Sequence, residues 1–402
     1  MDSHKGSDVA SNVALVSPYF WPERLGCALY FTDVARFLTT RFGTVDVFTA
    51  IPHYPSKKSA MDSVLSSDDS VRIMKIRRAW LFDRSKGGFV VRVCNDLLFA
   101  VQVMIQSILA RKPCSAALIL VPTALAIPAM RLLHPRARLV AVVYDIESTL
   151  ARATRIVTSR IVSSWLDTVE AWCINRADSV LVLSPQMEQV LVSIGVKRPV
   201  AVVPIWTAIQ ADQPAAKSHS NTLMYSGGLA RRHGSDALPE FWRRLNQRLS
   251  TCRLIIQGED SQIDKVRAAL LSTGGELVFR PIVQREMLAQ SLAEADLQLV
   301  LVSAEAADSS MPSKAVNCLA AGVPFLTNAP RNSVLAEFAL ESGGGHVVPD
   351  GSPDELAAAA ANLLANPTQL RQMGASGQKY VRTTRDPDQL RQLYSDLLLG
   401  TH

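Results

Sequence analysis

The chain has 402 residues, 48% of them hydrophobic and 19% charged, a composition that excludes a disordered or fibrous protein. This length is too great for one small core and predicts two domains of roughly 200 residues each. The formal net charge of +6 favours an anionic partner, such as a phosphate group, an acidic lipid surface or a nucleic acid, without choosing among them.

Apolar runs alternate with helical segments along the first half of the chain. Residues 12–17 form an apolar run, and residues 28–43 follow with apolar positions at helical spacing and a closing glycine. Further strand-like runs, each bounded by turn-forming or polar residues, lie at 44–50, 115–121, 137–145 and 178–184. Strands interleaved with helices predict a parallel, doubly wound sheet.

The alternation restarts after a segment rich in prolines and in small and polar residues. Strand-like runs are predicted at 222–227, 252–258, 276–281, 297–302 and 323–328. Ser352, Pro353 and Glu355 spell a capping box at the start of a late helix.

The two halves therefore predict an α/β protein with two domains. We expect an N-terminal Rossmann-like domain over 1–205, a linker over 206–221 and a second Rossmann-like domain over 222–375. A helical tail over 376–402 could cross back to the first domain.

The longest nearly apolar run, residues 97–109, has 13 residues and contains two glutamines. It falls short of the roughly 20 residues that span a bilayer, and we expect it to form a buried helix. The basic stretches at 75–78 and 151–160 suit a protein that rests on an anionic inner leaflet.

The cysteines and the N-terminus bear on the cellular compartment. Six cysteines are scattered without a C-x-x-C pair, so neither a zinc ribbon nor a disulfide framework is indicated. Residues 1–12 are polar and lack the apolar segment of a signal peptide. We expect a cytoplasmic protein.

Ligands of doubly wound domains bind outside the carboxyl ends of the strands, so the loops there are the first candidates. In the loop at 17–27, Gly26 either lets the backbone approach a ligand phosphate or serves the turn alone. Asp145 ends a strand, where it could accept a proton from an acceptor hydroxyl or hold the loop by an Asx turn.

Paired glycines and paired arginines follow the first strand of the second half. Gly227 and Gly228 leave backbone N–H groups accessible, and Arg231 or Arg232 offers a planar donor fork to phosphate oxygens. A solvated pair of surface arginines is the alternative, but the position after a strand favours phosphate binding.

A short helix predicted over 312–321 provides a third candidate. Its N-terminal N–H groups, Ser313 and the ammonium of Lys314 would form an anion site that suits a diphosphate. Lys314 and Asn317 share a face of this helix different from the one that faces the core.

Two common nucleotide motifs and the usual metal-binding patterns are missing. The sequence has no G-x-G-x-x-G after a strand, no G-x-x-x-x-G-K-[ST] and no His/Cys cluster at metal spacing. We therefore expect a metal-independent reaction without a cofactor.

Nine segments occur in an order that resembles the family 4 retaining glycosyltransferases of the GT-B fold, especially the bacterial colanic-acid-type and O-antigen branch. They are SPYFWPERLG, TAIPHYP, YDIE, ADSVLVLSPQM, VVPIW, YSGGLARRHG, MPSKAVNCLAAGVPFLTN, GGGHVVPDGSPDELAAAA and NPTQLRQMGASGQKYV. The resemblance runs nearly end to end.

This resemblance implies two Rossmann-like domains that face each other across a cleft. It implies a nucleotide sugar, first of all a UDP-N-acetyl sugar, held by the C-terminal domain. The acceptor would be a saccharide, linked to a polyprenyl diphosphate, held by the N-terminal domain, with no nucleic acid involved. Arg231 or Arg232 and Lys314 would hold the diphosphate, whose negative charge grows as it leaves.

The sequence departs from the family at one pair of positions. Many members carry two glutamates at the positions of Ser309 and Asn317. Asn317 could still bind the ribose, and Glu305 or Asp308 could replace the carboxylate that Ser309 lacks, although a solvated loop charge is the alternative for Glu305.

Two other functions compete with sugar transfer. A nucleotide-sugar epimerase of the same two-lobed fold would need several acid/base side chains, and the chain has only seven histidines. A non-catalytic partner would bind the donor without turnover because of the missing carboxylate at Ser309.

Overall fold

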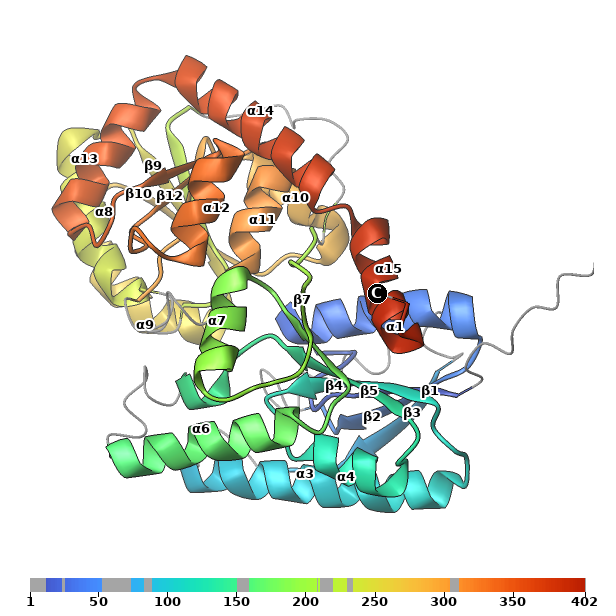
Figure 1. The fold of residues 1–402 in the computed structure, drawn as a ribbon. Helices are drawn as coiled ribbons and strands as arrows, with labels where there is room; N and C mark the ends of the chain where they lie inside the picture. Colours follow the sequence, from blue (N-terminus) through green and yellow to red (C-terminus); the bar gives the residue numbers. More distant parts are fainter. Residues whose placement is uncertain are drawn as a thin grey trace, which may run out of the picture. The chain divides into compact units, whose positions relative to one another are not determined.

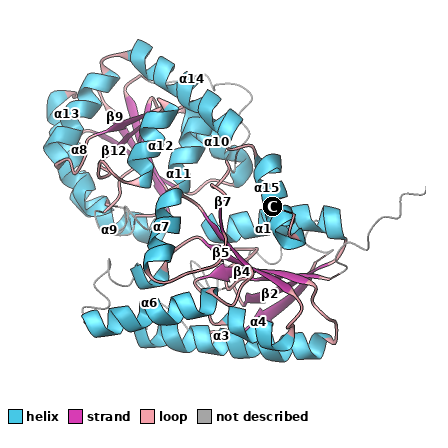
Figure 2. Ribbon diagram, in the orientation of Figure 1, coloured by secondary structure: helices cyan, strands magenta, loops and turns pink. Residues whose placement is uncertain are grey.

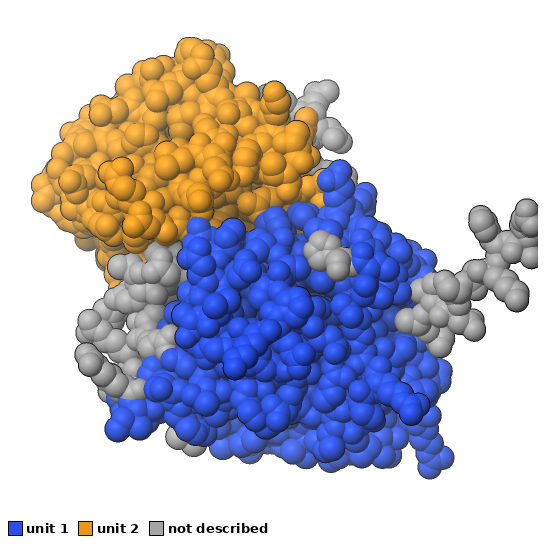
Figure 3. Space-filling model, in the orientation of Figure 1, with its two compact units in different colours: residues 1–204, 388–402 blue, residues 205–387 orange. Residues whose placement is uncertain are grey.

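The protein forms two compact units in a computed structural model, whose ribbon is drawn in Figure 1. Unit 1 comprises Met1–Pro204 and Asp388–His402, and unit 2 comprises Ile205–Pro387 (Figure 3). The structure describes residues 12–23, 26–52, 74–82, 89–149, 159–207, 209, 220–229, 234–303 and 311–401.

Unit 1 is built on a seven-stranded parallel sheet of order β3-β2-β1-β4-β5-β6-β7. Val13 of the central strand pairs with Val45 on one side and with Ala116 on the other. The strands are β1 (Val13–Val16), β2 (Val45–Ala50), β3 (Lys75–Ala79), β4 (Ala116–Val121), β5 (Arg138–Val143), β6 (Ser179–Val182) and β7 (Val200–Val202).

Helices cover both faces of this sheet, as Figure 2 shows by colour. Three helices lie on one face: α3 (Phe89–Ala110), α4 (Ala126–Leu133) and α6 (Arg160–Ile174). The other face carries α1 (Gly26–Phe42) and α15 (Pro387–Leu399), and α7 (Pro185–Ser193) joins β6 to β7.

The C-terminal helix α15 is bound firmly to unit 1. The hydroxyl of Tyr394 lies 2.9 Å from that of Tyr144, and Arg391 forms an ion pair with Asp33 at 3.2 Å. Arg138 donates a hydrogen bond to the carbonyl of Leu397. The last residues of the chain are therefore part of the first unit.

Unit 2 has a six-stranded parallel sheet of order β10-β9-β8-β11-β12-β13. Its strands are β8 (Thr222–Ser226), β9 (Arg253–Gly258), β10 (Glu276–Pro281), β11 (Leu297–Leu299), β12 (Phe325–Thr327) and β13 (Gly345–Val347). Its α-helices are α8 (Leu238–Arg248), α9 (Asp260–Leu271), α10 (Arg285–Ala293), α11 (Ser313–Ala320), α12 (Val334–Ser342), α13 (Pro353–Leu364) and α14 (Pro367–Thr384).

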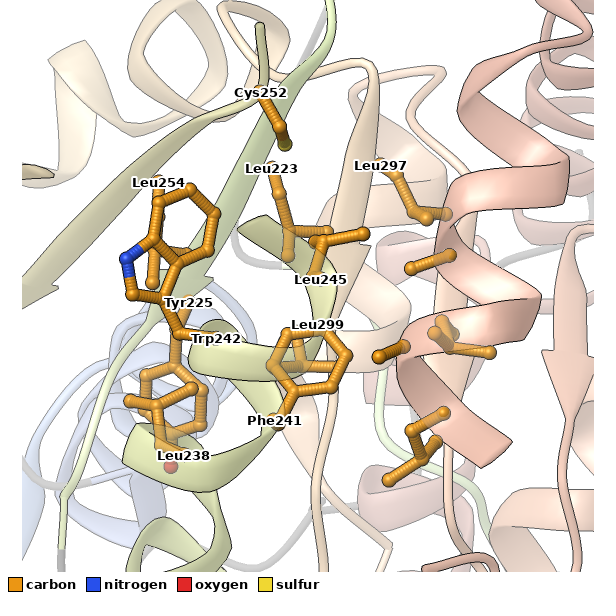
Figure 4. Close-up of a cluster of buried hydrophobic side chains, with 14 of the residues drawn as sticks. Leu223, Tyr225, Leu238, Phe241, Trp242, Leu245, Cys252, Leu254, Leu297 and Leu299 are labelled. Atoms are coloured by element: carbon orange, nitrogen blue, oxygen red, sulfur yellow. The ribbon is translucent and has the colours of Figure 1, made fainter. Parts of the chain in front are cut away.

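The core of unit 2 lies between its sheet and the helices α8 and α13. Figure 4 shows Phe241 and Trp242 of α8 packed against Leu254 and other strand residues. Both aromatic side chains are fully buried, and the indole N–H of Trp242 donates to the carbonyl of Gly274. The capping box of Ser352 and Glu355 forms at the start of α13, as predicted.

The α/β fold class is confirmed, and every predicted run contains a strand. Three strands, β3, β7 and β13, were not predicted. β7 and β13 are three-residue edge strands and only partly buried. β13 contains the polar His346, whereas β7 is apolar and was missed.

The basic stretch at 75–78 lies in the edge strand β3, and its expected place at a membrane surface stays a prediction. Arg78 donates to the carbonyls of Trp21 and Ala50, and Arg77 lies 3.5 Å from the carboxylate of Asp46. Only Lys75 in this stretch is exposed. Residues 151–158 of the second basic stretch lie outside the described residues.

The run at 97–109 belongs to a long helix that is only partly buried, so the expectation of a buried helix was wrong. Among the described residues, this is the one helix long and apolar enough to span a bilayer: Val91–Ala110, with a mean hydropathy of 1.6 and 28% of the segment buried. The helix begins before the run, at Phe89, and its polar residues Asn95 and Gln102 bind the backbone of unit 1.

The expected boundary between residues 375 and 376 falls inside the continuous helix α14. This helix packs on α11, α12 and α13 and lies wholly in unit 2, which ends at Pro387. At the other boundary, Trp206 is buried in unit 2 although the linker was expected to begin there.

Candidate functional site

A tight turn follows β8, where Gly227 and Gly228 lie. Gly227 has φ = +111°, a conformation that L side chains rarely adopt, and its N–H donates to the carbonyl of Gln257. The carbonyl of Gly227 also lies 3.2 Å from the position that a Cβ on Gly258 would occupy. Glycine is thus required at Gly227 for its backbone conformation, and the neighbouring strand β9 needs a small residue beside it.

Tyr225 connects this turn to Lys314. Its phenol donates to the carbonyl of Gly228 at 2.8 Å, and the ammonium of Lys314 donates to the phenol oxygen at 3.3 Å. The same ammonium lies 4.5 Å from the centre of the Tyr225 ring, within the range of a cation–π contact. Burial raises the pKa of Tyr225, which keeps the phenol protonated and able to donate to Gly228.

The sequence placed Gly228 and Lys314 in two separate candidate loops, and the structure brings them together. The residue that joins them, Tyr225, was not predicted. Its signal is present in the sequence, because Tyr225 carries a hydroxyl at the end of an apolar strand and stands two residues before the paired glycines.

Helix α11 presents Lys314 and Asn317 away from the core. Its buried residues are Ala315, Val316, Cys318, Leu319 and Ala320, whereas Ser313, Lys314 and Asn317 are partly exposed. The residue before the helix is Pro312, whose side chain makes no capping hydrogen bond to the helix N-terminus. Ser313 and Lys314 thus lie in a first turn whose backbone N–H groups have no such cap.

Asn317 has a neighbour at the start of unit 2. Its amide oxygen accepts a long hydrogen bond, 3.4 Å, from the hydroxyl of Thr207. Thr207 follows Trp206, so the chain that enters unit 2 passes beside α11. The role of Asn317 toward a ribose stays a prediction.

Several predicted site residues lie outside the described residues: Arg231, Arg232, Glu305, Asp308 and Ser309. Their proposed roles toward the diphosphate and the sugar stay predictions.

In unit 1, the candidate residues gather where β1, β3 and β5 end. Gly26 is the first residue of α1, and Asp145 follows β5 by two residues. Burial, together with the nearby charges of Asp145 and Glu23, raises the pKa of the Cys27 thiol to about 12. Glu23 is itself buried and lies close enough to Arg78 to affect the pKa of its guanidinium.

A second residue that was not predicted holds the loop after β5. The carboxylate of Glu170, in α6, accepts backbone hydrogen bonds from Glu147 at 3.0 Å and from Ser148 at 3.1 Å. Its side chain is buried, and burial raises its pKa. Because Asp145 stands two residues before Glu147, Glu170 fixes the loop that carries the candidate acid.

The described residues include no group of three or more His, Cys, Asp or Glu side chains that could hold a metal ion. The expectation of a metal-independent reaction stays a prediction.

Two family models match the chain, one for each half. Residues 26–206 match the model described as "Glycosyl transferase 4-like domain", and residues 220–366 match "Glycosyl transferases group 1". The chain is a family 4-type glycosyltransferase. No curated protein sequence matches this glycosyltransferase closely enough to count as a relative.

Solved structures of similar fold cover nearly the whole glycosyltransferase. Sucrose-phosphate synthase from Thermosynechococcus elongatus has a TM-score of 0.75 at 17% identity and covers 97% of this chain and 100% of its own. WaaG, a glycosyltransferase involved in lipopolysaccharide biosynthesis, has a TM-score of 0.68 at 16% identity, over 96% of this chain and 100% of its own.

A third similar structure was solved with nucleotide and sugar bound. Anabaena Alr3699/HepE in complex with UDP and glucose has a TM-score of 0.69 at 12% identity, over 97% of this chain and 99% of its own. At such low identities these likenesses establish the GT-B fold of the glycosyltransferase.

Proposed function

We propose that this glycosyltransferase moves a sugar from a UDP-N-acetyl sugar to a saccharide acceptor with retention of anomeric configuration. The acceptor is a saccharide linked to a polyprenyl diphosphate, and the product belongs to a bacterial surface polysaccharide. The enzyme works in the cytoplasm, at the inner face of the plasma membrane, without a metal ion or another cofactor.

The contact from Lys314 through Tyr225 to Gly228 carries the donor part of this proposal. It fixes an ammonium group beside a glycine turn and the first turn of α11, within one unit. Backbone N–H groups at a helix start and a lysine ammonium are groups that bind a diphosphate. The diphosphate gains negative charge as the sugar leaves, so groups held in place beforehand stabilise the transition state.

Three further sets of residues complete the proposed site. Arg231 or Arg232 holds the diphosphate from the loop after Gly228. Asn317 faces the ribose, and Glu305 supplies the carboxylate toward the sugar. Asp145, held by Glu170 through the loop after β5, faces the acceptor hydroxyl and accepts its proton.

The donor site is tested by calorimetric titration of UDP and then GDP into the wild type and into Lys314→Ala. We expect UDP to bind better than GDP, and Lys314→Ala to weaken UDP binding by roughly tenfold to a hundredfold, in line with about 1.5–3 kcal/mol for a hydrogen bond to a charged group. Lys379→Ala, at an exposed position of α14, is the matched control and should bind like the wild type.

If Lys314→Ala binds UDP as well as the wild type does, this assignment is wrong. A second measurement separates a transferase from a non-catalytic binder. Release of UDP from UDP-N-acetylglucosamine should depend on a membrane extract that contains lipid-linked saccharides. Release without acceptor would indicate hydrolysis, and binding of the donor without any release would indicate the non-catalytic partner.

A further inference from the structure

Helix α3 is apolar on its outer side as well as on the side that faces the sheet, where Phe99 and Val103 are buried. From Cys94 to Leu109, each exposed position is uncharged, and all but Cys94 are large and aliphatic. These positions recur at the spacing of one helical face: Leu97, Val101, Ile105, Ile108 and Leu109, with exposed fractions from 50% to 70%.

Three amide side chains of α3 form hydrogen bonds with backbone groups at the edge of the sheet. The amide of Gln102 exchanges two hydrogen bonds with the backbone of Trp80, and the amide of Asn95 does the same with Phe82. Gln106 donates to the carbonyl of Arg78. These amides form hydrogen bonds with backbone groups in and next to the edge strand β3, so α3 is fixed to unit 1 along its length.

Helix α6, on the same face of the sheet (Figure 1), also carries large apolar side chains on its outer side. It buries the carboxylate of Glu170, whereas its exposed positions from Ile161 to Trp172 carry no charge. Ile161 is 84% exposed, Trp165 is 59% exposed and Trp172 is 49% exposed. We call the exposed positions of α3 and α6, together with half-exposed Trp80 and Phe82, the apolar face.

The most exposed charges near the apolar face are basic. Within the described residues of 89–178, Arg111, Lys112 and Arg136 are exposed, whereas Asp96 and Asp167 are only partly exposed. Arg176 lies 3.4 Å above the ring of Trp172. A second copy of the chain on this face would bring these cations toward their own counterparts, whereas an anionic lipid surface attracts them.

We propose that the apolar face is the surface on which the enzyme binds an anionic lipid monolayer. The aliphatic positions of α3 and the tryptophans of α6 enter the boundary between headgroups and acyl chains, and the flanking cations contact the headgroups. Helix α3 lies in the membrane plane rather than across it, because its amides stay bound to Trp80 and Phe82. This inference rests on the proposed function in one respect: the lipid-linked acceptor is the reason why the enzyme needs a lipid surface.

The test is sedimentation with vesicles of phosphatidylcholine alone or mixed with phosphatidylglycerol. The wild type should bind the mixed vesicles, and the double variant Ile105→Gln with Leu109→Gln should bind at least roughly tenfold more weakly, because two exposed aliphatic side chains no longer enter the lipid. The matched control changes Leu271 and Leu340 of unit 2, exposed at 58% and 70%, to glutamine. It should bind like the wild type.

Exposed tryptophans give an independent readout. Emission of the wild type should shift to shorter wavelength with mixed vesicles, and lipids brominated along the acyl chain should quench it, since Trp80, Trp165 and Trp172 are half-exposed. Absence of vesicle binding, or equal loss in the control, would overturn the proposal. So would a wild-type dimer in light scattering that the Ile105/Leu109 variant abolishes, because a second copy would then occupy the face.

This test is separate from that of the donor site. UDP titration of the Ile105/Leu109 variant should give the wild-type affinity, because both residues belong to unit 1 and the donor site to unit 2. Loss of UDP binding in Lys314→Ala with intact vesicle binding would leave both proposals standing.

Discussion

Helices α8 and α3 both bury apolar side chains against a parallel sheet, but they differ in the side chains that they expose. Helix α8 buries Leu238, Phe241, Trp242 and Leu245 and keeps its arginines at the surface. Helix α3 buries Phe99 and Val103, binds strand-edge backbone through its amides, and leaves five aliphatic side chains exposed. Helix α8 thus presents charged side chains to the solvent, whereas α3 presents aliphatic ones.

The difference also concerns what stabilises each helix. Helix α8 is held by the hydrophobic effect, since two large aromatic side chains leave water when it packs. Helix α3 is held in part by hydrogen bonds from side-chain amides to backbone groups, which are worth less individually. The sequence periodicity of an apolar helix therefore does not reveal which side faces the sheet.

The largest effect that sharpens this comparison is expected at Phe241. Phe241→Ala should lower the free energy of unfolding of unit 2 by about 3–5 kcal/mol, because it leaves a cavity in the core shown in Figure 4. Hydrogen exchange followed by mass spectrometry measures each unit separately. Leu340→Ala, at an exposed position of α12, should change the exchange of unit 2 little, and equal effects of the two variants would contradict the account of this core.

A smaller effect is expected at Asn95, which is buried on the inner side of α3. Asn95→Leu keeps a similar volume but leaves the N–H and the carbonyl of Phe82 without their amide partner. The free energy of unfolding of unit 1 should fall by about 1–3 kcal/mol, the cost of unsatisfied buried polar groups. Urea unfolding measures it, and a variant as stable as the wild type would mean that the amides do not hold α3.

The smallest effect depends on pH and concerns Glu170 in α6. Burial raises its pKa above the ordinary 4.5, so between 4.5 and the folded-state pKa the folded protein binds a proton that the unfolded chain has released. The free energy of unfolding therefore falls as pH rises through this window. Glu170→Gln removes this dependence, so the wild type should lose stability relative to the variant as pH rises through the window.

Urea unfolding of both proteins at several pH values gives this difference directly, since the other carboxylates cancel. A difference that is independent of pH, or that grows in favour of the wild type as pH rises, would mean that the Glu170 carboxylate is not destabilised by burial.

The sequence was sufficient for the fold because buried parallel strands leave continuous apolar runs. The runs at 115–121 and 137–145 contain β4 and β5, which are almost wholly buried on both faces. Strands β3 and β13 left no such signal, since edge strands are partly exposed and their side chains need not be apolar. Strand β7 is apolar but has only three residues, and it was missed. The basic composition of β3 suggested a surface, while Arg78 in fact binds backbone carbonyls.

The candidate site was predictable only in pieces. Gly228 and Lys314 were found from local patterns. Their common partner Tyr225 is 89 positions from Lys314, and a local pattern does not reveal a contact between residues so far apart in the sequence. The exposure of α3 was also beyond the sequence, because a run of Leu, Val and Ile has the same letters whether it faces a core or a membrane. Only the hydrogen bonds of Asn95 and Gln102 decide the orientation.

The pairing of Tyr144 with Tyr394 has a consequence for how the chain is made. Because α15 belongs to unit 1, unit 2 is an insertion within the sequence of unit 1. When the whole sheet of unit 1 has left the ribosome, the residues of α15, which complete this unit, have not yet emerged. Unit 1 is therefore the first unit whose synthesis begins and the last that can fold completely. The hydrogen bond between Tyr144 and Tyr394 can form only when synthesis of the chain is nearly complete.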